Sequence, residues 1–297
     1  MKLNVWIAAI VMGCAVLLVS QETQAPHVGP LSGGGFRLNN NWTLRPAGQQ
    51  IDVDTLPMRS AFSKNGKFML VLNGGYNPPS VSVIDIASRK ELGRTRVTDA
   101  WEGLSFAPTG TSVYVGGGSQ AKVYEFSFNP ETGSLTPSRE LSTVTDPANP
   151  GKSFIGDVVV SADGRLLYAA DVMENQIAVI NLQSGKLIER WKTGRRPYRI
   201  LLAPDGKSFY VSNWADASVV RQDALSGDQI SMVRTGPHPT DLVWLNKPAP
   251  TDETNESAYA SRLFVAAANT NSVFSFGVTN DGDLRPMEII NLSLTPF

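Results

Sequence analysis

The stretch LLAPDGKSFYVSNWADASVV, residues 201–220, decides the fold because versions of it recur along the chain. Apolar residues alternate with polar ones on either side of the Asp-Gly pair at 205–206, and this pair suits a tight turn that needs a positive φ. Three further stretches share the pattern and have a glycine at the turn; they begin at Ala61, Ser105 and Val159. The stretch therefore predicts a β-hairpin that the chain repeats.

The spacing of the copies indicates the class of repeat protein. The strand residue after each turn falls at Val71, Val115, Ala169, Val211 and Val265. Successive copies are thus 44, 54, 42 and 54 residues apart, and a period in the low forties with loop insertions is typical of four-stranded propeller blades. Helical repeats would need a periodicity of about 3.6 residues, which the copies do not show. We expect an all-β fold, a β-propeller of four-stranded blades.

Each copy supplies four runs that read as strands. In the fourth copy these runs are Ile200–Ala203, Ser208–Asn213, Ser218–Gln222 and Gln229–Arg234. The fifth copy starts at His238 and is interrupted by the polar insertion Asn246–Ser261. It resumes with strands expected over Arg262–Ala267, Ser272–Gly277 and Met287–Leu292.

The two ends of the sequence suggest that the ring is incomplete. The segment Trp42–Val53 resembles the last two strands of a copy, with no inner strand pair before it, and no sixth copy follows the fifth. Propellers often combine strands from both termini in one blade, which removes exposed edges. We expect about five blades of an incomplete six- or seven-bladed ring, in the N-terminal part of a longer protein. The alternative is a five-bladed ring with a redundant amino-terminal hairpin.

The first 25 residues indicate export. Lys2 precedes an apolar run from Val5 to Val19, and these 15 residues are short of the roughly 20 that a membrane span needs. We expect residues 1–25 to act as a signal peptide or an N-terminal anchor, and the protein to be periplasmic or secreted. Contact with a membrane would occur only through this segment if it stays uncleaved. Residues 26–41, rich in Pro, Gly and Asn, are expected to be a flexible leader before a partial propeller over 42–297.

Composition excludes several kinds of chemistry. The 297 residues are 42% hydrophobic and 18% charged, which is ordinary for a globular protein, and the net charge of -1 argues against nucleic acid as a partner. The only cysteine is Cys14, inside the apolar run, and the only histidines are His27 and His238. We therefore expect no metal site and no cofactor.

The inner strands suggest where a binding site would lie, because the loops that enter them ring one mouth of a propeller's central channel. In the first four copies, the residues seven positions before the turn glycine are Arg59, Gly103, Asp157 and Arg199. In the fifth copy, the Pro-x-x frame matches Asp241 to the same position. One residue earlier stand Met58, Glu102, Gly156, Tyr198 and Thr240. The mouth is predicted to hold two arginines and three carboxylates, flanked by Trp101 and Tyr198.

Two interpretations of this mouth remain open. In the first it is a polar pocket whose arginines bind a carboxylate or phosphate and whose acids bind hydroxyl groups or a cation. Its candidate ligand-binding residues are Arg59, Trp101, Glu102, Asp157, Tyr198, Arg199, Trp214 and Asp241. In the second it is a hydrated channel whose charges pair with one another across the axis, because a channel mouth needs polar residues merely to face water.

Several stretches resemble a known repeat family. FYVSNWADASVV (209–220), AVINLQSGKLIERWKTGRRPY (178–198) and VSADGRLLYAADVMENQIAVINL (160–182) resemble the YVTN-type β-propeller repeat of exported proteins related to the YncE-like and lactonase-like seven-bladed propellers. The resemblance covers about residues 42–292. WTLRPAGQQIDVDTLPM (42–58), AWEGLSFAPTG (100–110) and GRRPYRILLAPDGKSFYVSNW (194–214) are similar to the amino-terminal propeller of bacterial proteins fused to an alkaline-phosphatase-like phosphoesterase. That resemblance implies hydrolysis only for a second domain that nothing in this sequence matches.

Two classes of function follow. The first is a non-enzymatic, exported binding or scaffold module whose partner at the mouth is a protein or a small molecule, because no catalytic constellation stands out in the sequence. The second is an enzyme: either the propeller portion of a phosphoesterase, or a lactonase-like hydrolase. In the hydrolase, Glu102 or Asp157 would act as general base and Arg199 would hold the substrate anion. An acid and arginine cluster containing a carboxylate whose pKa is raised by burial would favour the lactonase.

Overall fold

The computed structural model describes residues 27–246, 259 and 261–292. The chain divides into two compact units, Met1–Gln50 and Ile51–Phe297. The expected export segment, residues 1–25, lies outside the described residues, as does most of the polar insertion Asn246–Ser261. Within the described ranges, no helix has the length and apolar character needed to cross a membrane.

The first unit contains a small three-stranded antiparallel sheet, in the order β1 (Gly29–Pro30), β2 (Phe36–Arg37) and β3 (Thr43–Leu44). Strands β1 and β2 lie in the segment for which a flexible leader is expected. The sequence also predicts an outer pair of blade strands over Trp42–Val53, and there the structure differs, because β3 pairs with β2 instead. Both residues of β3 are exposed, so this segment buries no apolar face that would hold a blade strand pair in place.

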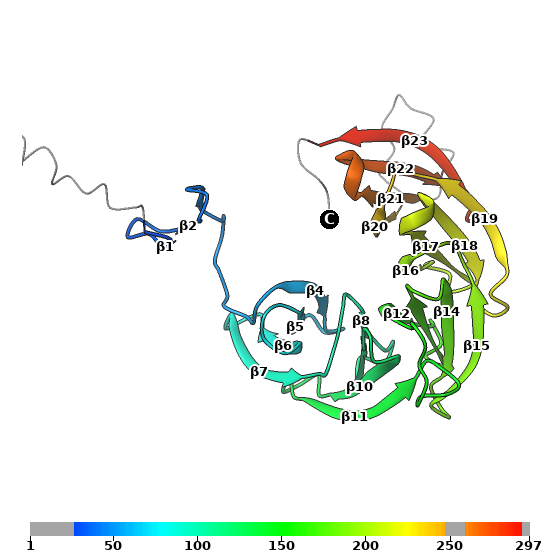
Figure 1. Cartoon of the computed structure of the whole chain (residues 1–297), viewed down its shortest axis with the longest axis horizontal. Helices are drawn as coiled ribbons and strands as arrows, with labels where there is room; N and C mark the ends of the chain where they lie inside the picture. The colour runs from blue at the N-terminus through cyan, green and yellow to red at the C-terminus, as the bar shows by residue number, and fades with distance from the viewer. Residues whose placement is uncertain (1–26, 247–258, 260, 293–297) are drawn as a thin grey trace, which may run out of the picture. The chain divides into compact units, whose positions relative to one another are not determined.

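The second unit consists of five four-stranded antiparallel sheets whose strands pair in chain order (Figure 1). The first sheet contains β4 (Pro57–Phe62), β5 (Phe68–Asn73), β6 (Ser80–Asp85) and β7 (Lys90–Arg96), and the second contains β8 (Leu104–Phe106), β9 (Ser112–Gly116), β10 (Lys122–Phe128) and β11 (Leu135–Ser142). The third contains β12 (Ile155–Val160), β13 (Leu166–Asp171), β14 (Gln176–Asn181) and β15 (Lys186–Lys192).

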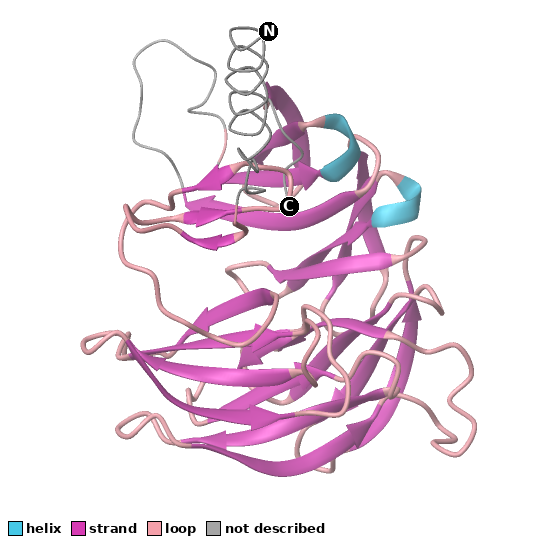
Figure 2. Ribbon diagram, turned by 60° about the vertical axis from the view of Figure 1, so that its left-hand side comes forward, coloured by secondary structure: helices cyan, strands magenta, loops and turns pink. Residues whose placement is uncertain are grey.

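The fourth sheet contains β16 (Pro197–Leu202), β17 (Ser208–Asn213), β18 (Ser218–Asp223) and β19 (Gln229–Arg234), and the fifth contains β20 (Pro239–Asn246), β21 (Ser261–Ala267), β22 (Ser272–Val278) and β23 (Leu284–Asn291). Two single 3-10 turns, Trp214–Asp216 and Ala268–Thr270, follow β17 and β21 (Figure 2). In each sheet the first strand lies on the inside and the fourth on the outside (Figure 1). The all-β propeller fold of four-stranded blades is confirmed.

The turn between the first two strands of a sheet has the conformation that the repeated glycine predicts. Gly66, Gly110, Gly164 and Gly206 have φ between +68° and +78°, a region that other residues adopt only at a cost. In the fourth sheet the N–H of Gly206 donates to the carbonyl of Ala203 at 2.9 Å. The glycine therefore closes the turn at the point where the alternating apolar pattern reverses direction.

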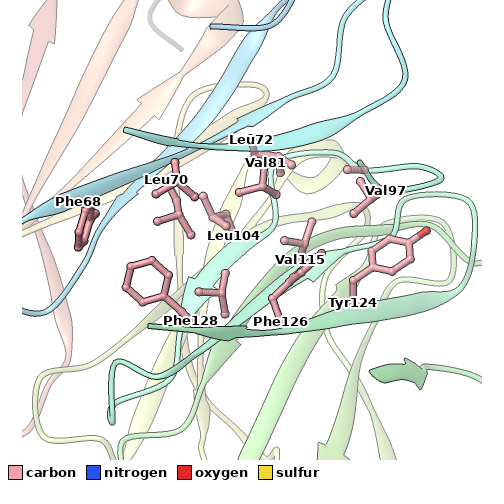
Figure 3. Close-up of a cluster of buried hydrophobic side chains, with 13 residues drawn as sticks. Phe68, Leu70, Leu72, Val81, Val97, Leu104, Val115, Tyr124, Phe126 and Phe128 are labelled. Atoms are coloured by element: carbon pink, nitrogen blue, oxygen red, sulfur yellow. The ribbon is translucent and has the colours of Figure 1, made fainter. Parts of the chain in front are cut away.

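The hydrophobic core lies between neighbouring sheets. Leu70 and Leu72 of the first sheet meet Val115 and Phe126 of the second in a cluster of buried side chains (Figure 3). Comparable clusters join the second sheet to the third, the third to the fourth and the fourth to the fifth. Because alternate residues of a strand point to opposite faces, each interior sheet packs on both neighbours. This stacking fixes the starts of the inner strands relative to one another.

Candidate functional site

The inner strands begin with an irregular register at the same place in four of the five sheets. The pairing with the second strand shifts between Pro57 and Arg59, between Ile155 and Asp157, between Pro197 and Arg199, and between Pro239 and Leu242. Such a β-bulge leaves an extra residue unpaired and changes the direction in which side chains point. In the second sheet the inner strand starts only at Leu104, and Gly103 occupies the equivalent position.

The side chains at these bulges form one chain of ion pairs. The Nη1 atom of Arg199 lies 3.0 Å from both carboxylate oxygens of Asp157, whose side chain is fully buried. The Nε atom of Arg199 lies 2.9 Å from Oδ1 of Asp241, and Nη1 of Arg59 lies 3.3 Å from Oδ2 of the same carboxylate. We call Asp157, Arg199, Asp241 and Arg59 the ion-pair chain; it joins the third, fourth, fifth and first sheets.

A second layer of side chains comes from the residues one position earlier. The hydroxyl of Tyr198, in the fourth sheet, donates to Oε1 of Glu102, at the start of the second sheet, at 2.9 Å. The side chain of Trp101 interacts with the same hydroxyl. The equivalent residue of the intervening third sheet is Gly156, which has no side chain to separate them. Trp101 also packs edge-on against Phe154 and remains 39% exposed.

Burial changes the acidity of the carboxyl groups. It raises the pKa of Asp157 from 3.8 to about 7, although the positive charge of Arg59 and the backbone N–H groups of Ile200 and Val158 oppose the rise. Burial also raises the pKa of Glu102, and the hydrogen bond from Tyr198 opposes this second shift. Burial and the neighbouring Glu102 raise the pKa of Tyr198, so its hydroxyl stays protonated. Burial therefore favours the protonated form of Asp157 far more than in an exposed aspartate.

Two arginine nitrogens in the ion-pair chain have unused hydrogen-bonding capacity. Nε of Arg59 is buried and has no hydrogen-bond partner among the described residues. Nε of Arg199 likewise makes no aligned hydrogen bond there, although it lies close to Asp241. Since buried donors are normally satisfied, an acceptor from a ligand or from water is expected at Arg59. Arg59 and Asp241 are the more accessible end, with side chains 21% and 36% exposed.

Ser212 is a structural part of this site that the sequence reasoning does not find. Its Oγ accepts the backbone N–H of Arg199 at 3.1 Å and donates to the carbonyl of Thr240 at 2.7 Å. The hydroxyl therefore links the bulges of the fourth and fifth sheets. Ser212 pairs with Arg199 across the two strands, so a small hydroxyl residue opposite an expected bulge is the signal that could have identified it.

Trp214 is a predicted ligand-binding residue that the structure does not bring to the ion-pair chain. Its ring stacks on His238, with centroids 3.8 Å apart and planes 19° apart. The other seven predicted residues lie in the two layers described above, and whether they bind a ligand stays a prediction. In the part of the chain that the structure describes, no group of three or more His, Cys, Asp or Glu side chains is arranged to hold a metal ion.

Fold and site together define a class, a β-propeller with charged side chains at the starts of its inner strands. A family model described as "Lactonase, 7-bladed beta-propeller" matches residues 102–244. This match includes Glu102, Asp157, Arg199 and Asp241, and it leaves out Arg59 and the whole first sheet. A comparison with curated proteins finds no match.

Solved structures share the fold at low sequence identity. Hydrazine synthase of Kuenenia stuttgartiensis is similar with a TM-score of 0.61 and 18% identity, over 84% of this chain and 71% of that one. A protein from Lactobacillus plantarum gives a TM-score of 0.63 and 16% identity, over 91% and 80% of the two chains. A functionally unknown protein from Desulfotomaculum acetoxidans gives a TM-score of 0.59 and 17% identity, over 86% of this chain and 81% of that one. These likenesses support the propeller architecture alone.

Proposed function

We propose that the second unit binds a small organic acid at the ion-pair chain, with Arg59 receiving the carboxylate. The observation that carries this proposal is the buried, unpartnered Nε of Arg59 at the accessible end of the chain. A guanidinium presents parallel N–H groups that match the two oxygens of a carboxylate. Arg59 uses only Nη1 toward Asp241, so donors remain for a ligand.

The charges of the site favour a ligand with one negative charge. Two arginines face three carboxyl groups, and the raised pKa of Asp157 lowers the negative charge that this group carries near neutral pH. The site is therefore close to neutral overall. A single carboxylate can bind there without strong repulsion, whereas a phosphate would bring a second negative charge toward Asp241.

The binding proposal predicts that 4-hydroxybutyrate, a simple hydroxy acid, binds the folded protein with a Kd in the millimolar range or below. In Arg59→Met we expect the affinity to fall at least about tenfold, because the bidentate donor is lost. Isothermal titration calorimetry measures both values. Arg285→Met is the matched control, since the Arg285 side chain is 61% exposed at the outer strand of the fifth sheet. Equal affinities for the wild type and Arg59→Met would refute the assignment of Arg59.

Lactone hydrolysis is a second candidate function, supported by the family match and by the raised pKa of Glu102. Asp157 is fully enclosed, so Glu102 is the carboxylate that a water molecule reaches more easily. Glu102 would take a proton from water as the water oxygen attacks the lactone carbonyl. The ring C–O bond then breaks, and the leaving alkoxide takes up a proton, which yields a hydroxy acid.

The hydrolase candidate predicts slow but measurable opening of γ-butyrolactone, followed by pH-stat titration of the acid released. Glu102→Gln is expected to lower the rate about 100-fold, because an amide cannot accept the proton. Glu131→Gln, at a side chain 72% exposed on an outer turn, serves as the control. If the protein does not accelerate the reaction above its uncatalysed rate, only the binding function remains.

The wider setting proposed for this module follows from the resemblance of its sequence. It would work in the periplasm or outside the cell as an exported scaffold or binding domain. In a fusion with an alkaline-phosphatase-like phosphoesterase, the propeller would hold a carboxylate-bearing ligand or a protein, and the second domain would carry out the phosphate chemistry.

A further inference from the structure

Four loops at one end of the third, fourth and fifth sheets form a connected surface. They span residues 172–175, 193–196, 214–217 and 235–238, and in an antiparallel blade such loops fall at the same end of the strands. The N–H of Arg196 donates to Oδ1 of Asn175 at 2.8 Å, and the N–H of Trp214 donates to the carbonyl of Arg196 at 2.9 Å. The stacking of Trp214 on His238 connects the fourth loop. The loops therefore support one another.

This surface carries three arginines, Arg195, Arg196 and Arg234, beside two acidic residues, Glu174 and Asp216. Nε of Arg195 lies 2.6 Å from Oδ1 of Asp216, and Nη1 of Arg234 donates to the backbone carbonyl of Asp216 at 2.8 Å. Nη1 of Arg196 contacts the sulfur of Met173 at 3.0 Å. Two guanidinium groups, those of Arg195 and Arg234, thus lie close to Asp216. Within the described ranges, neither Arg196 nor Arg234 forms an ion pair with an acidic side chain, in a chain whose net charge is -1.

The backbone of this surface is held in a fixed and costly conformation. Each of the four loops contains a residue other than glycine with positive φ: Asn175 at 58°, Arg196 at 56°, Ala217 at 49° and His238 at 57°. Such a conformation costs about 1–2 kcal/mol for most residues with a side chain, and less for asparagine. The loops keep it because hydrogen bonds and stacking hold them together. A surface that is already ordered loses little conformational entropy when a partner binds.

The residue types favour another protein as that partner. We define the cationic rim as Met173, Arg195, Arg196, Trp214, Arg234 and His238. Arginine, tryptophan and methionine are enriched at the centres of protein interfaces and among the residues that dominate binding energy. Met173 is 39% exposed and offers an apolar contact beside the arginines. We propose that the cationic rim binds an acidic segment of another protein, whose carboxylates pair with Arg196 and Arg234.

Fluorescence anisotropy with a fluorescein-labelled peptide of alternating Asp and Glu residues tests the proposal. We expect saturable binding at low salt that weakens as salt is added, because exposed charges are screened. The double variant Arg196→Met with Arg234→Met should weaken binding at least about tenfold. The matched control, Arg165→Met with Lys207→Met, removes two exposed cations from the turns at the other end of the same sheets and should change little.

Three results would overturn the proposal. Equal loss in the control variant would mean that the peptide responds only to net charge. Binding of a short DNA duplex or of phosphatidylglycerol vesicles with the same dependence on Arg196 and Arg234 would replace the acidic protein by a nucleic acid or a membrane. Salt-independent binding by the wild type would also exclude the ion pairs. This measurement does not depend on the folding of any variant. This proposal does not depend on the ligand proposed for the ion-pair chain.

Discussion

Asp171→Ala is expected to lower the free energy of unfolding by about 2–4 kcal/mol, because it removes a fully buried carboxylate that accepts several hydrogen bonds and pairs with the partly buried Arg190. The side chain of Asp171 is fully buried at the end of β13. Its Oδ2 accepts from Nη2 of Arg190 at 2.7 Å and from Oγ of Ser153 at 2.6 Å, while Oδ1 accepts the N–H of Phe154 at 3.0 Å. All these donors would lose their acceptor together.

The same carboxylate holds a long loop in place. Ser153 and Phe154 end the connection that leads from β11 to β12, and Nη1 of Arg190 also binds the carbonyl of Thr143 at the start of that connection. Removal of Asp171 therefore loosens the loop at both ends. Chemical denaturation measures the loss. Asp171→Asn should cost less, since an amide oxygen can still accept some of these hydrogen bonds.

Glu131→Ala provides the comparison for Asp171→Ala. Glu131 lies 2.6 Å from Nζ of Lys67, and both side chains are more than half exposed. Exposed ion pairs contribute about 0–1 kcal/mol, so this variant should be nearly as stable as the wild type. Similar losses for the two variants would show that Asp171 does not carry the role assigned to it.

Asp157→Asn is expected to change how stability depends on pH. The pKa of Asp157 is about 7 in the folded protein and 3.8 in the unfolded chain, so the folded state binds the proton more tightly. Its contribution to stability is complete below about pH 4 and is lost as the pH rises toward 7.

The neutral amide of Asp157→Asn cannot ionise and should remove this loss. The variant resembles the protonated acid, and its oxygen can still accept the N–H of Ile200, which lies 2.8 Å from Oδ2 in the wild type. Denaturation midpoints of both proteins at about pH 5 and pH 7.5 test the expectation. The difference in stability should move in favour of the variant as the pH rises. Parallel curves would show that Asp157 does not titrate in this range.

Much of this architecture could be predicted from short-range sequence patterns. The repeated turn glycine and the alternation around it predict the inner hairpin, because positive φ and the two-residue period of a strand are local properties. Counting seven residues back from that glycine predicts that Arg59, Asp157 and Arg199 lie at the channel mouth. The Pro-x-x frame predicts the same for Asp241. These positions depend on the repeat and not on contacts between distant residues.

Features set by contacts between blades could not be predicted in the same way. Trp214 occupies a loop next to the site, yet its ring stacks on His238 of the following blade, and no local pattern indicates that partner. Ser212 matters because its hydroxyl joins two bulges, and serine is common in strands without any such role.

The ion pair between Arg59 and Asp241 has a consequence for synthesis of the protein. The two residues are separated by 182 positions, whereas most sheet contacts join neighbouring segments of the chain. Each blade can pair its own strands soon after the ribosome releases them, because repeat units interact mainly with their neighbours. The site, however, needs the first and the fifth sheet together. The ion-pair chain therefore forms only after the fifth blade has been made, and a chain that has completed four blades still lacks Asp241.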